Sequence, residues 1–171
     1  MNSFEVIKYK IHNAENIQPI LAAWRLKSEK IVFTNGCFDI LHPGHVEYLA
    51  KARSMGNRMI VGINSDTSVK KLEKGNNRPI QSEEARALVL ASLQMVDAVI
   101  IFNEETPLEL IRIILPDVLV KGGDYDAHET NPTSKKYIVG SDVVKTKGGA
   151  IITIPFVEGY STSNIEKKIK G

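Results

Sequence analysis

The sequence has little that would tie it to a membrane or to a disulfide framework. Its single cysteine, Cys37, has no second thiol to pair with, and we expect a reducing compartment. Uninterrupted apolar runs such as Ala98–Phe102 are far shorter than the roughly 20 residues that span a bilayer. Residues 1–10 mix charged and apolar side chains and lack the apolar stretch of a signal peptide. These features predict a cytoplasmic protein with no membrane partner.

Charge is nearly balanced, which argues against a nucleic-acid partner. The formal net charge of +2 is small, and basic residues are spread along the chain. What is present is the composition of an ordinary globular domain, with 43% hydrophobic and 25% charged residues in a chain of 171. A chain of this length can bury a well-developed core.

Short apolar segments alternate with helical patterns along most of the chain. Helices are expected at about 43–55, 82–95, 107–115, 134–139 and 161–170, and Ser65 and Asp66 would cap a short additional one. Five buried strands are expected at 30–34, 58–63, 97–102, 117–121 and 150–154. The alternation predicts a Rossmann-like α/β fold with a five-stranded parallel sheet and helices on both faces.

The first 29 residues are interpreted as an extension that precedes this main fold. Ile17, Ile20, Leu21 and Trp24 recur at helical spacing and predict an amphipathic helix over 13–29. Such a helix packs on the fold or supports a dimer. The chain is therefore divided into residues 1–29 and a domain over 30–171.

Polar, glycine-containing segments follow three of the expected strands. They cover 35–45, 70–78 and 121–125. Ligands of open parallel sheets bind beyond the carboxyl ends of the strands, where the strand order reverses. We expect the three segments to meet at that edge of the sheet.

The segment after the first of these strands contains His-Pro-Gly-His, residues 42–45. Gly36 permits a tight turn, and Gly44 lets a ligand approach the backbone closely. His42 and His45 flank the start of a helix, where free N–H groups and the helix dipole attract phosphate. The motif predicts a phosphate site.

Gly-Cys-Phe-Asp at 36–39 followed by His-Pro-Gly-His resembles the first motif of the cytidylyltransferase-like nucleotidyltransferase superfamily. Lys-Gly-Gly-Asp-Tyr at 121–125 and Gly-Tyr-Ser-Thr-Ser-Asn-Ile at 159–165 extend the match. Together they resemble the heptose 1-phosphate adenylyltransferases that make ADP-heptose for surface glycans such as lipopolysaccharide. In many bacteria that activity is one half of a fused kinase–adenylyltransferase. The resemblance implies that residues 30–171 form a nucleotidyltransferase domain of the HxGH type.

The resemblance also implies a reaction. AMP would move from ATP to D-glycero-β-D-manno-heptose 1-phosphate, giving ADP-heptose and pyrophosphate. His42, His45 and Lys71 would act on the phosphates, and Mg²⁺ would be bound mainly by the substrate phosphates. Related enzymes suggest a homodimer.

A larger set of residues is expected to bind the nucleotide. Gly123 and Asp124, with Lys121, would contact the nucleoside, and hydroxyls at 161–163 would contact the β- and γ-phosphates or simply cap the last helix. The full set is Asn35, Gly36, Cys37, Phe38, Gly44, Lys121, Gly123, Asp124, Ser161, Thr162 and Ser163.

Several charged residues allow two interpretations. Lys70, Lys71 and Lys74 form either a solvated loop or a cover over the phosphates. Arg78 and Arg86 are weaker candidates for covering the phosphates, and the alternative for Arg86 is a surface ion pair. Asp39 is expected to fix its loop, and segment 126–147 to shape the acceptor pocket.

Two other functions remain open from the sequence. One is a CTP-dependent cytidylyltransferase acting on glycerol or a polyol phosphate. Enzymes of that kind carry Arg-Thr-Glu-Gly-Ile-Ser, whereas residues 156–161 read Phe-Val-Glu-Gly-Tyr-Ser without the arginine, which favours ATP. The other is a non-catalytic nucleotide-binding regulatory subunit.

Overall fold

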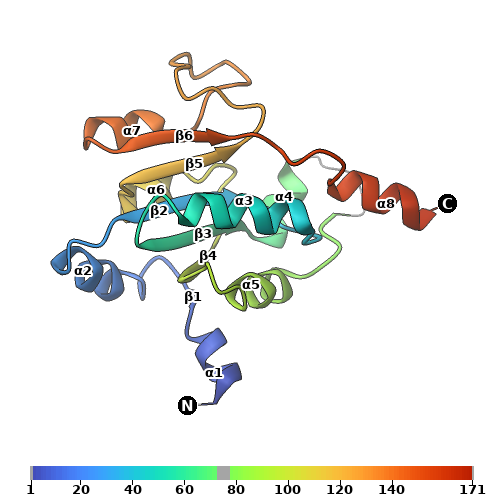
Figure 1. Ribbon diagram of the computed structural model, residues 1–171, viewed down its shortest axis with the longest axis horizontal. Helices are drawn as coiled ribbons and strands as arrows, with labels where there is room; N and C mark the ends of the chain where they lie inside the picture. The colour runs from blue at the N-terminus through green and yellow to red at the C-terminus, as the bar shows by residue number, and fades with distance from the viewer. Residues whose placement is uncertain (1, 73–77, 171) are drawn as a thin grey trace.

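A six-stranded parallel sheet runs through the centre of the molecule (Figure 1). The computed structural model describes residues 2–72 and 78–170, and the strand order is β1-β4-β3-β2-β5-β6. The strands are β1 (Ile11–His12), β2 (Ile31–Gly36), β3 (Arg58–Asn64), β4 (Ala98–Phe102), β5 (Val118–Gly122) and β6 (Ala150–Ile154). From β2 the chain adds β3 and β4 on one side, then returns to add β5 and β6 on the other. The order therefore reverses between β2 and β5.

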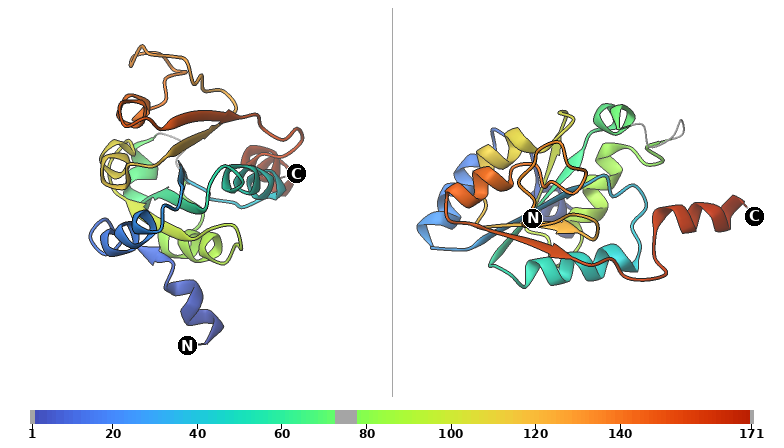
Figure 2. Two further views of the ribbon diagram at one scale, coloured as in Figure 1. Left: turned by 60° about the vertical axis from the view of Figure 1, so that its left-hand side comes forward. Right: turned by 90° about the horizontal axis from the view of Figure 1, so that it is seen from above.

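Helices cover both faces of the sheet (Figure 2). α3 and α5 pack on one face, and α2, α6 and α7 pack on the other. α8 projects away from the body of the molecule (Figures 1 and 2). The bounds are α1 (Ser3–Lys8), α2 (Gln18–Leu26), α3 (Pro43–Arg53), α4 (Asp66–Lys71), α5 (Glu83–Ala91), α6 (Leu108–Ile114), α7 (Ser141–Thr146) and α8 (Thr162–Lys170).

The central strands are apolar along their length because both of their faces are covered. In β2, the side chains of Ile31 to Thr34 are all buried, and β3 is buried from Met59 onward. One side of β2 faces α2 and α6, with Phe33 in contact distance of the apolar cluster there, and Val32 faces α3 and α5. The alternation of strands and helices that the sequence predicts is confirmed.

Two details of the prediction are wrong. The sheet has six strands rather than five, because β1 pairs with β4 through Ile11 and Val99. A two-residue strand is too short to produce a recognisable apolar pattern. No helix forms over 134–139. That stretch is a series of turns, and the helix α7 begins only at Ser141 after Gly140 in a left-handed conformation.

The N-terminal segment packs against the sheet through few side chains. Ile17 and Leu21 are fully buried with the α6 side of the core, and the Arg58 guanidinium lies 5.3 Å from the centre of the Trp24 ring. α2 is shorter than the helix expected over 13–29, and α1 was not anticipated. The division of the chain at residue 29 stays a prediction.

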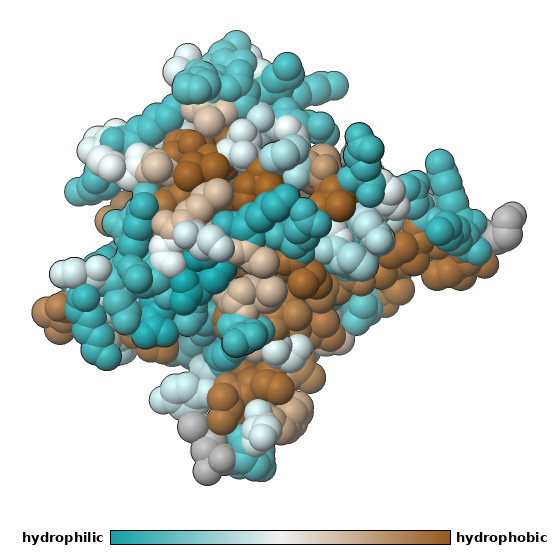
Figure 3. Space-filling view, in the orientation of Figure 1, coloured by the Kyte–Doolittle hydropathy of each residue, from teal (hydrophilic) through white to brown (hydrophobic). Residues whose placement is uncertain are grey.

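The surface combines charged regions with exposed apolar ones. In the space-filling view, hydrophobic surface extends beneath the projecting α8 and near α1 (Figure 3). Phe4 and Val6 of α1 and Ile169 of α8 are among the exposed large hydrophobic residues. Among the residues that the structure describes, no helix is both long and apolar enough to cross a bilayer.

Replacing Phe33 with Ala should destabilise the protein strongly. Phe33 is fully buried in the central strand, and the cavity left by its ring should lower the free energy of unfolding by about 3–5 kcal/mol. Leu26→Ala is the matched control, because Leu26 is 89% exposed and its loss should cost less than about 0.5 kcal/mol. Urea unfolding of the two variants measures the difference; equal midpoints would contradict the assignment of Phe33 to the core.

Candidate functional site

A cavity of about 900 Å³ opens where the strand order reverses. Its walls come from the carboxyl ends of β2, β3 and β5, the start of α3, the loop after β5 and the segment leading into α8. Eleven of the expected site residues line it: Asn35, Gly36, Cys37, Phe38, His42, Gly44, His45, Lys121, Ser161, Thr162 and Ser163. The sheet topology therefore brings together segments that are far apart in the sequence.

The two histidines stack on each other at the start of α3. Their ring centres are 3.8 Å apart, and the ring planes differ by 22°. His42 is the N-cap residue in an extended conformation, and Pro43 opens the helix with a φ angle suited to its first turn. A Cβ atom on Gly44 would lie 3.1 Å from His42 Nδ1 and 3.1 Å from Tyr160 Cβ. The absence of a side chain at residue 44 therefore leaves room for the His42 ring.

Both histidines are half-buried. Burial lowers the pKa of His42, and burial together with the charge of nearby His42 lowers the pKa of His45 to about 4. In the described part of the chain, the Nδ1 atoms of His42 and His45 are buried and have no hydrogen-bond partner. Buried polar atoms are normally paired, so these two atoms are exceptions within the described residues.

The loop after β2 supports this pair. Phe38 adopts a left-handed backbone conformation with φ 49°, and its ring centre lies 5.2 Å from that of His45. A Cβ atom on Gly36 would lie 3.1 Å from the Phe38 ring, so the glycine leaves space for that ring. The conformation of Phe38 thus places its ring against the His45 ring.

Asp39 is buried and fully occupied by protein donors. Its carboxylate accepts from the backbone N–H groups of Ile80 and Gln81 and from the Arg78 guanidinium, at 2.9–3.0 Å. Burial alone would raise the pKa of Asp39, but the backbone donors and Arg78 outweigh it, and the pKa lies below its usual value. Asp39 joins the loop after β2 to the segment before α5, as the sequence reading expected.

Lys121 and Gly122 form the opposite wall. The Lys121 ammonium is largely buried, donates to Asn35 Oδ1 and lies 5.4 Å from the centre of the Tyr125 ring. Gly123 has φ 39°, and a Cβ atom there would lie 2.3 Å from the Phe156 ring, which covers this turn. Asp124 is exposed, and neither it nor Gly123 is among the residues lining the cavity.

Ser161 caps the final helix while facing the cavity. Its hydroxyl accepts from the Asn164 N–H at 3.1 Å, and its carbonyl accepts from Ile165. Thr162 and Ser163 begin α8 and also line the cavity. Both functions considered for this segment are thus compatible with its geometry.

The remaining cations occupy different places. Lys71 ends α4, is exposed and does not line the cavity, whereas Lys74 lies outside the described residues. Arg78 lines the cavity and links Asp39 to Glu166 of α8. The interpretation of Arg86 as a surface ion pair is wrong, because its side chain is completely buried. Arg86 forms an ion pair with Asp66. The polar sequence around α5 gave no sign that the arginine is buried.

Two residues that line the cavity, Tyr48 and Asn64, were not expected from the sequence. Asn64 ends β3, and Tyr48 of α3 hydrogen-bonds to Thr34 while burial raises its pKa to about 12. Asn64 could have been found from its position at the carboxyl end of a strand, where ligands of parallel sheets bind. Phe156 also lines the cavity and was not expected to do so. Further lining side chains come from segments that were expected to border the site: Arg78, Tyr125, Lys135, Tyr137 and Tyr160. Their positions depend on loop conformations that have no sequence periodicity.

The side chains of the described residues do not form a metal site of their own. Within residues 2–72 and 78–170, no three His, Cys, Asp or Glu side chains lie together as a metal site. The carboxylate of the motif, Asp39, is already saturated by three groups of donors. These residues do not fit a metal held by the protein alone.

The His45 imidazole should stay neutral down to low pH. Its pKa of about 4 lies below the value near 6.5 of an exposed histidine, so the unfolded chain binds more protons between these pH values. The free energy of unfolding should therefore fall as pH falls from about 6.5 to 4. NMR titration of the His45 ring measures the pKa directly. His45→Asn should make the pH dependence of unfolding shallower, and an unchanged slope would contradict the assignment.

The chain resembles known proteins in sequence and in fold. It is 56% identical over 162 residues to the bifunctional protein HldE of Wolinella succinogenes, covering 95% of this chain and 31% of that protein. HldE of Nitrobacter winogradskyi is 52% identical over 159 residues, covering 93% and 31%. The chain thus spans about a third of the length of the curated relatives it matches.

Two solved structures share the fold. The lipopolysaccharide core biosynthesis protein of Thermoplasma volcanium superposes with a TM-score of 0.59 at 23% identity, over 78% of this chain and 99% of that one. The pantoate-beta-alanine ligase of Francisella tularensis gives 0.60 at 18% identity, over 94% and 76%. Residues 33–168 match the family described as Cytidylyltransferase-like, and the chain belongs to that family.

Proposed function

We propose that this chain is an adenylyltransferase that moves AMP from ATP to a sugar 1-phosphate, D-glycero-β-D-manno-heptose 1-phosphate, and releases pyrophosphate. The observation that carries the proposal is the stacked pair of His42 and His45, whose unpartnered Nδ1 atoms are buried beside a cavity of about 900 Å³. Lys121 supplies a buried cation across the same cavity.

The chemical problem is repulsion between two anions. At a separation of about 4 Å, each pair of unit charges costs roughly 4 kcal/mol at an effective dielectric constant near 20. Catalysis of phosphoryl and nucleotidyl transfer consists mainly of positioning the reactants and neutralising the charge that develops. A cavity with preorganised donors and little water suits that task.

The residues present can divide the work. An oxygen of the acceptor phosphate attacks the α-phosphorus, the bond from that phosphorus to the bridging oxygen breaks, and pyrophosphate leaves with the electron pair. His42 and His45 donate to the α- and β-phosphates as negative charge grows on them. Ser161, Thr162 and Ser163 at the start of α8 receive the β- and γ-phosphates. Proximity to phosphate favours protonation of the imidazoles and opposes the effect of burial.

The remaining assignments are part of the same proposal. Lys121, Gly123 and Asp124 contact the nucleoside, and Lys71 closes over the phosphates from the end of α4. Mg²⁺ arrives bound to the nucleotide phosphates and is part of the substrate. The protein acts as a homodimer.

The choice of nucleotide and acceptor rests on sequence. Residues 156–161 lack the arginine of the cytidylyltransferase pattern, which favours ATP over CTP. The HldE relatives are named bifunctional, and this chain matches about a third of their length, in keeping with one activity of two. The competing functions are a cytidylyltransferase for glycerol or polyol phosphates and a regulatory subunit that binds nucleotide without transferring it.

Pyrophosphate release measured with ATP or CTP against a panel of sugar and polyol phosphates distinguishes these functions. We expect activity with ATP and heptose 1-phosphate. Activity only with CTP would favour the cytidylyltransferase, and nucleotide binding without pyrophosphate release would favour the regulatory subunit.

Replacing His45 with Ala should lower the turnover rate at least about 100-fold and leave the fold intact, because it removes a donor to the transition state. His128→Ala is the matched control, since His128 lies on an exposed loop outside the cavity. Circular dichroism checks folding, and the pyrophosphate assay gives the rate. An undiminished rate in His45→Ala would exclude its proposed role.

A further inference from the structure

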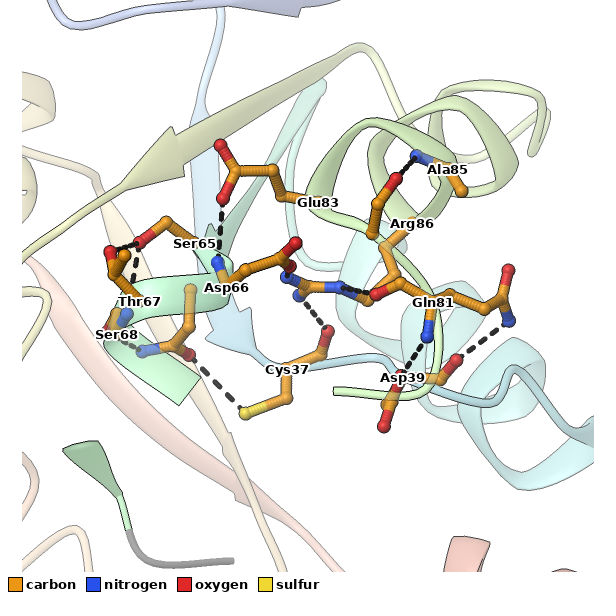
Figure 4. A network of polar contacts seen from close by, with 12 residues as sticks. Cys37, Asp39, Ser65, Asp66, Thr67, Ser68, Gln81, Glu83, Ala85 and Arg86 are labelled. Atoms are coloured by element: carbon orange, nitrogen blue, oxygen red, sulfur yellow. Dashed lines mark hydrogen bonds and ion pairs between the residues drawn. The ribbon is translucent and has the colours of Figure 1, made fainter. Parts of the chain in front are cut away.

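A buried arginine lies behind the wall of the cavity (Figure 4). The Arg86 side chain from α5 is fully buried, although it does not line the cavity itself. Its guanidinium donates to Asp66 Oδ1 at 2.7 Å, to the Cys37 carbonyl at 2.7 Å and to the Gln81 carbonyl at 3.1 Å. One side chain thus joins α5 to three other segments.

Burying a guanidinium is costly unless its donors are satisfied. The hydrogen bonds of Arg86 provide one carboxylate, that of Asp66, and two backbone carbonyls for three different nitrogens of the guanidinium. A planar, multidentate group is required for this arrangement, because a lysine ammonium is a point charge that cannot reach all three acceptors in the same geometry. Residue 86 therefore has to be arginine for the geometry of its three hydrogen bonds as well as for its charge.

The Cys37 carbonyl is the link from Arg86 to the histidine pair. Cys37 immediately precedes Phe38, whose φ of 49° is unfavourable for a side chain of that size and has to be held in place by its surroundings. The Phe38 ring then packs 5.2 Å from the His45 ring. The Cys37 carbonyl belongs to the peptide group that joins Cys37 to Phe38. The hydrogen bond from Arg86 therefore fixes the orientation of that peptide group.

Asp39 anchors the other end of the same short loop. It binds the backbone of Ile80 and Gln81, and the Gln81 side chain donates to the Asp39 carbonyl at 2.8 Å. Arg86 holds Gln81 as well, through its carbonyl. Both neighbours of Phe38 are therefore held: Cys37 by Arg86 of α5, and Asp39 by the segment that precedes α5 (Figure 4).

We propose that Arg86 is a positioning residue of the transfer site: through the Cys37 carbonyl and the Phe38 ring, its guanidinium holds the His45 imidazole in its desolvated, reactive orientation. This inference rests on the proposed function of the histidine pair. It gives Arg86 no contact with substrate.

Arg86→Lys tests the proposal, with kinetics and NMR as separate readouts. We expect the kcat to fall roughly 10- to 100-fold, because displacement of a reacting group by about 1 Å can cost about 100-fold. The KM for ATP should change less than about 3-fold, since the other nucleotide contacts remain in place. The pKa of His45, followed by NMR, should rise from about 4 toward its ordinary value as water reaches the ring.

Two further variants make the experiment decisive. Arg112→Lys on the exposed face of α6 is the matched control and should leave kcat and the His45 titration unchanged. Asp66→Asn keeps the shape of the Arg86 partner but removes its charge, so a smaller change in the same direction is expected. If Arg86→Lys does not fold, Asp66→Asn carries the test.

The outcomes separate this proposal from the proposed function. A folded Arg86→Lys or Asp66→Asn protein with the kcat and His45 titration of the wild type would overturn the role of Arg86, as would a loss confined to the KM for ATP. Wild-type protein that transfers no nucleotide to any acceptor would instead overturn the proposed function. The effect of Arg86 on the His45 titration could still be measured in that case.

Discussion

The site depends on a pair of stacked, half-buried imidazole rings at the beginning of α3. Burial lowers the pKa of both His42 and His45, so each ring takes up a proton less readily than an exposed histidine does. An anion bound between these rings and the opposite wall would raise both pKa values, because a nearby negative charge stabilises the protonated imidazole. The pair is therefore arranged for a phosphate rather than for solvent.

The sheet accounts for where this pair lies. The strand order reverses between β2 and β5, so the loops after these strands diverge and leave a cavity between them. Residues that follow β2 form one wall, and Lys121 at the end of β5 forms the other. Arg86 and Asp39 hold the first wall from behind, while the Arg78–Glu166 ion pair connects it to α8.

The sequence revealed the parts of this structure that depend on regular patterns. The apolar runs of β2 to β6 and the His-Pro-Gly-His motif identify the sheet, the start of α3 and the location of the cavity. Structural features that produce no regular sequence pattern could not be predicted. β1 has only two residues, the turns over 134–139 carry a misleading helical spacing, and the burial of Arg86 depends on partners 20 and 49 residues away. That Lys71, Gly123 and Asp124 contact substrate is still a prediction, because none of them lines the cavity.

The most direct test of the histidine pair is NMR titration of the imidazole rings with and without magnesium–ATP. The chain has four histidines, so each ring can be followed individually. If the triphosphate binds between the pair and the opposite wall, adding nucleotide should raise the pKa of both His42 and His45, while the resonances of His12 and His128 stay unchanged. Nucleotide binding that leaves the His42 and His45 titrations unmoved would contradict the account.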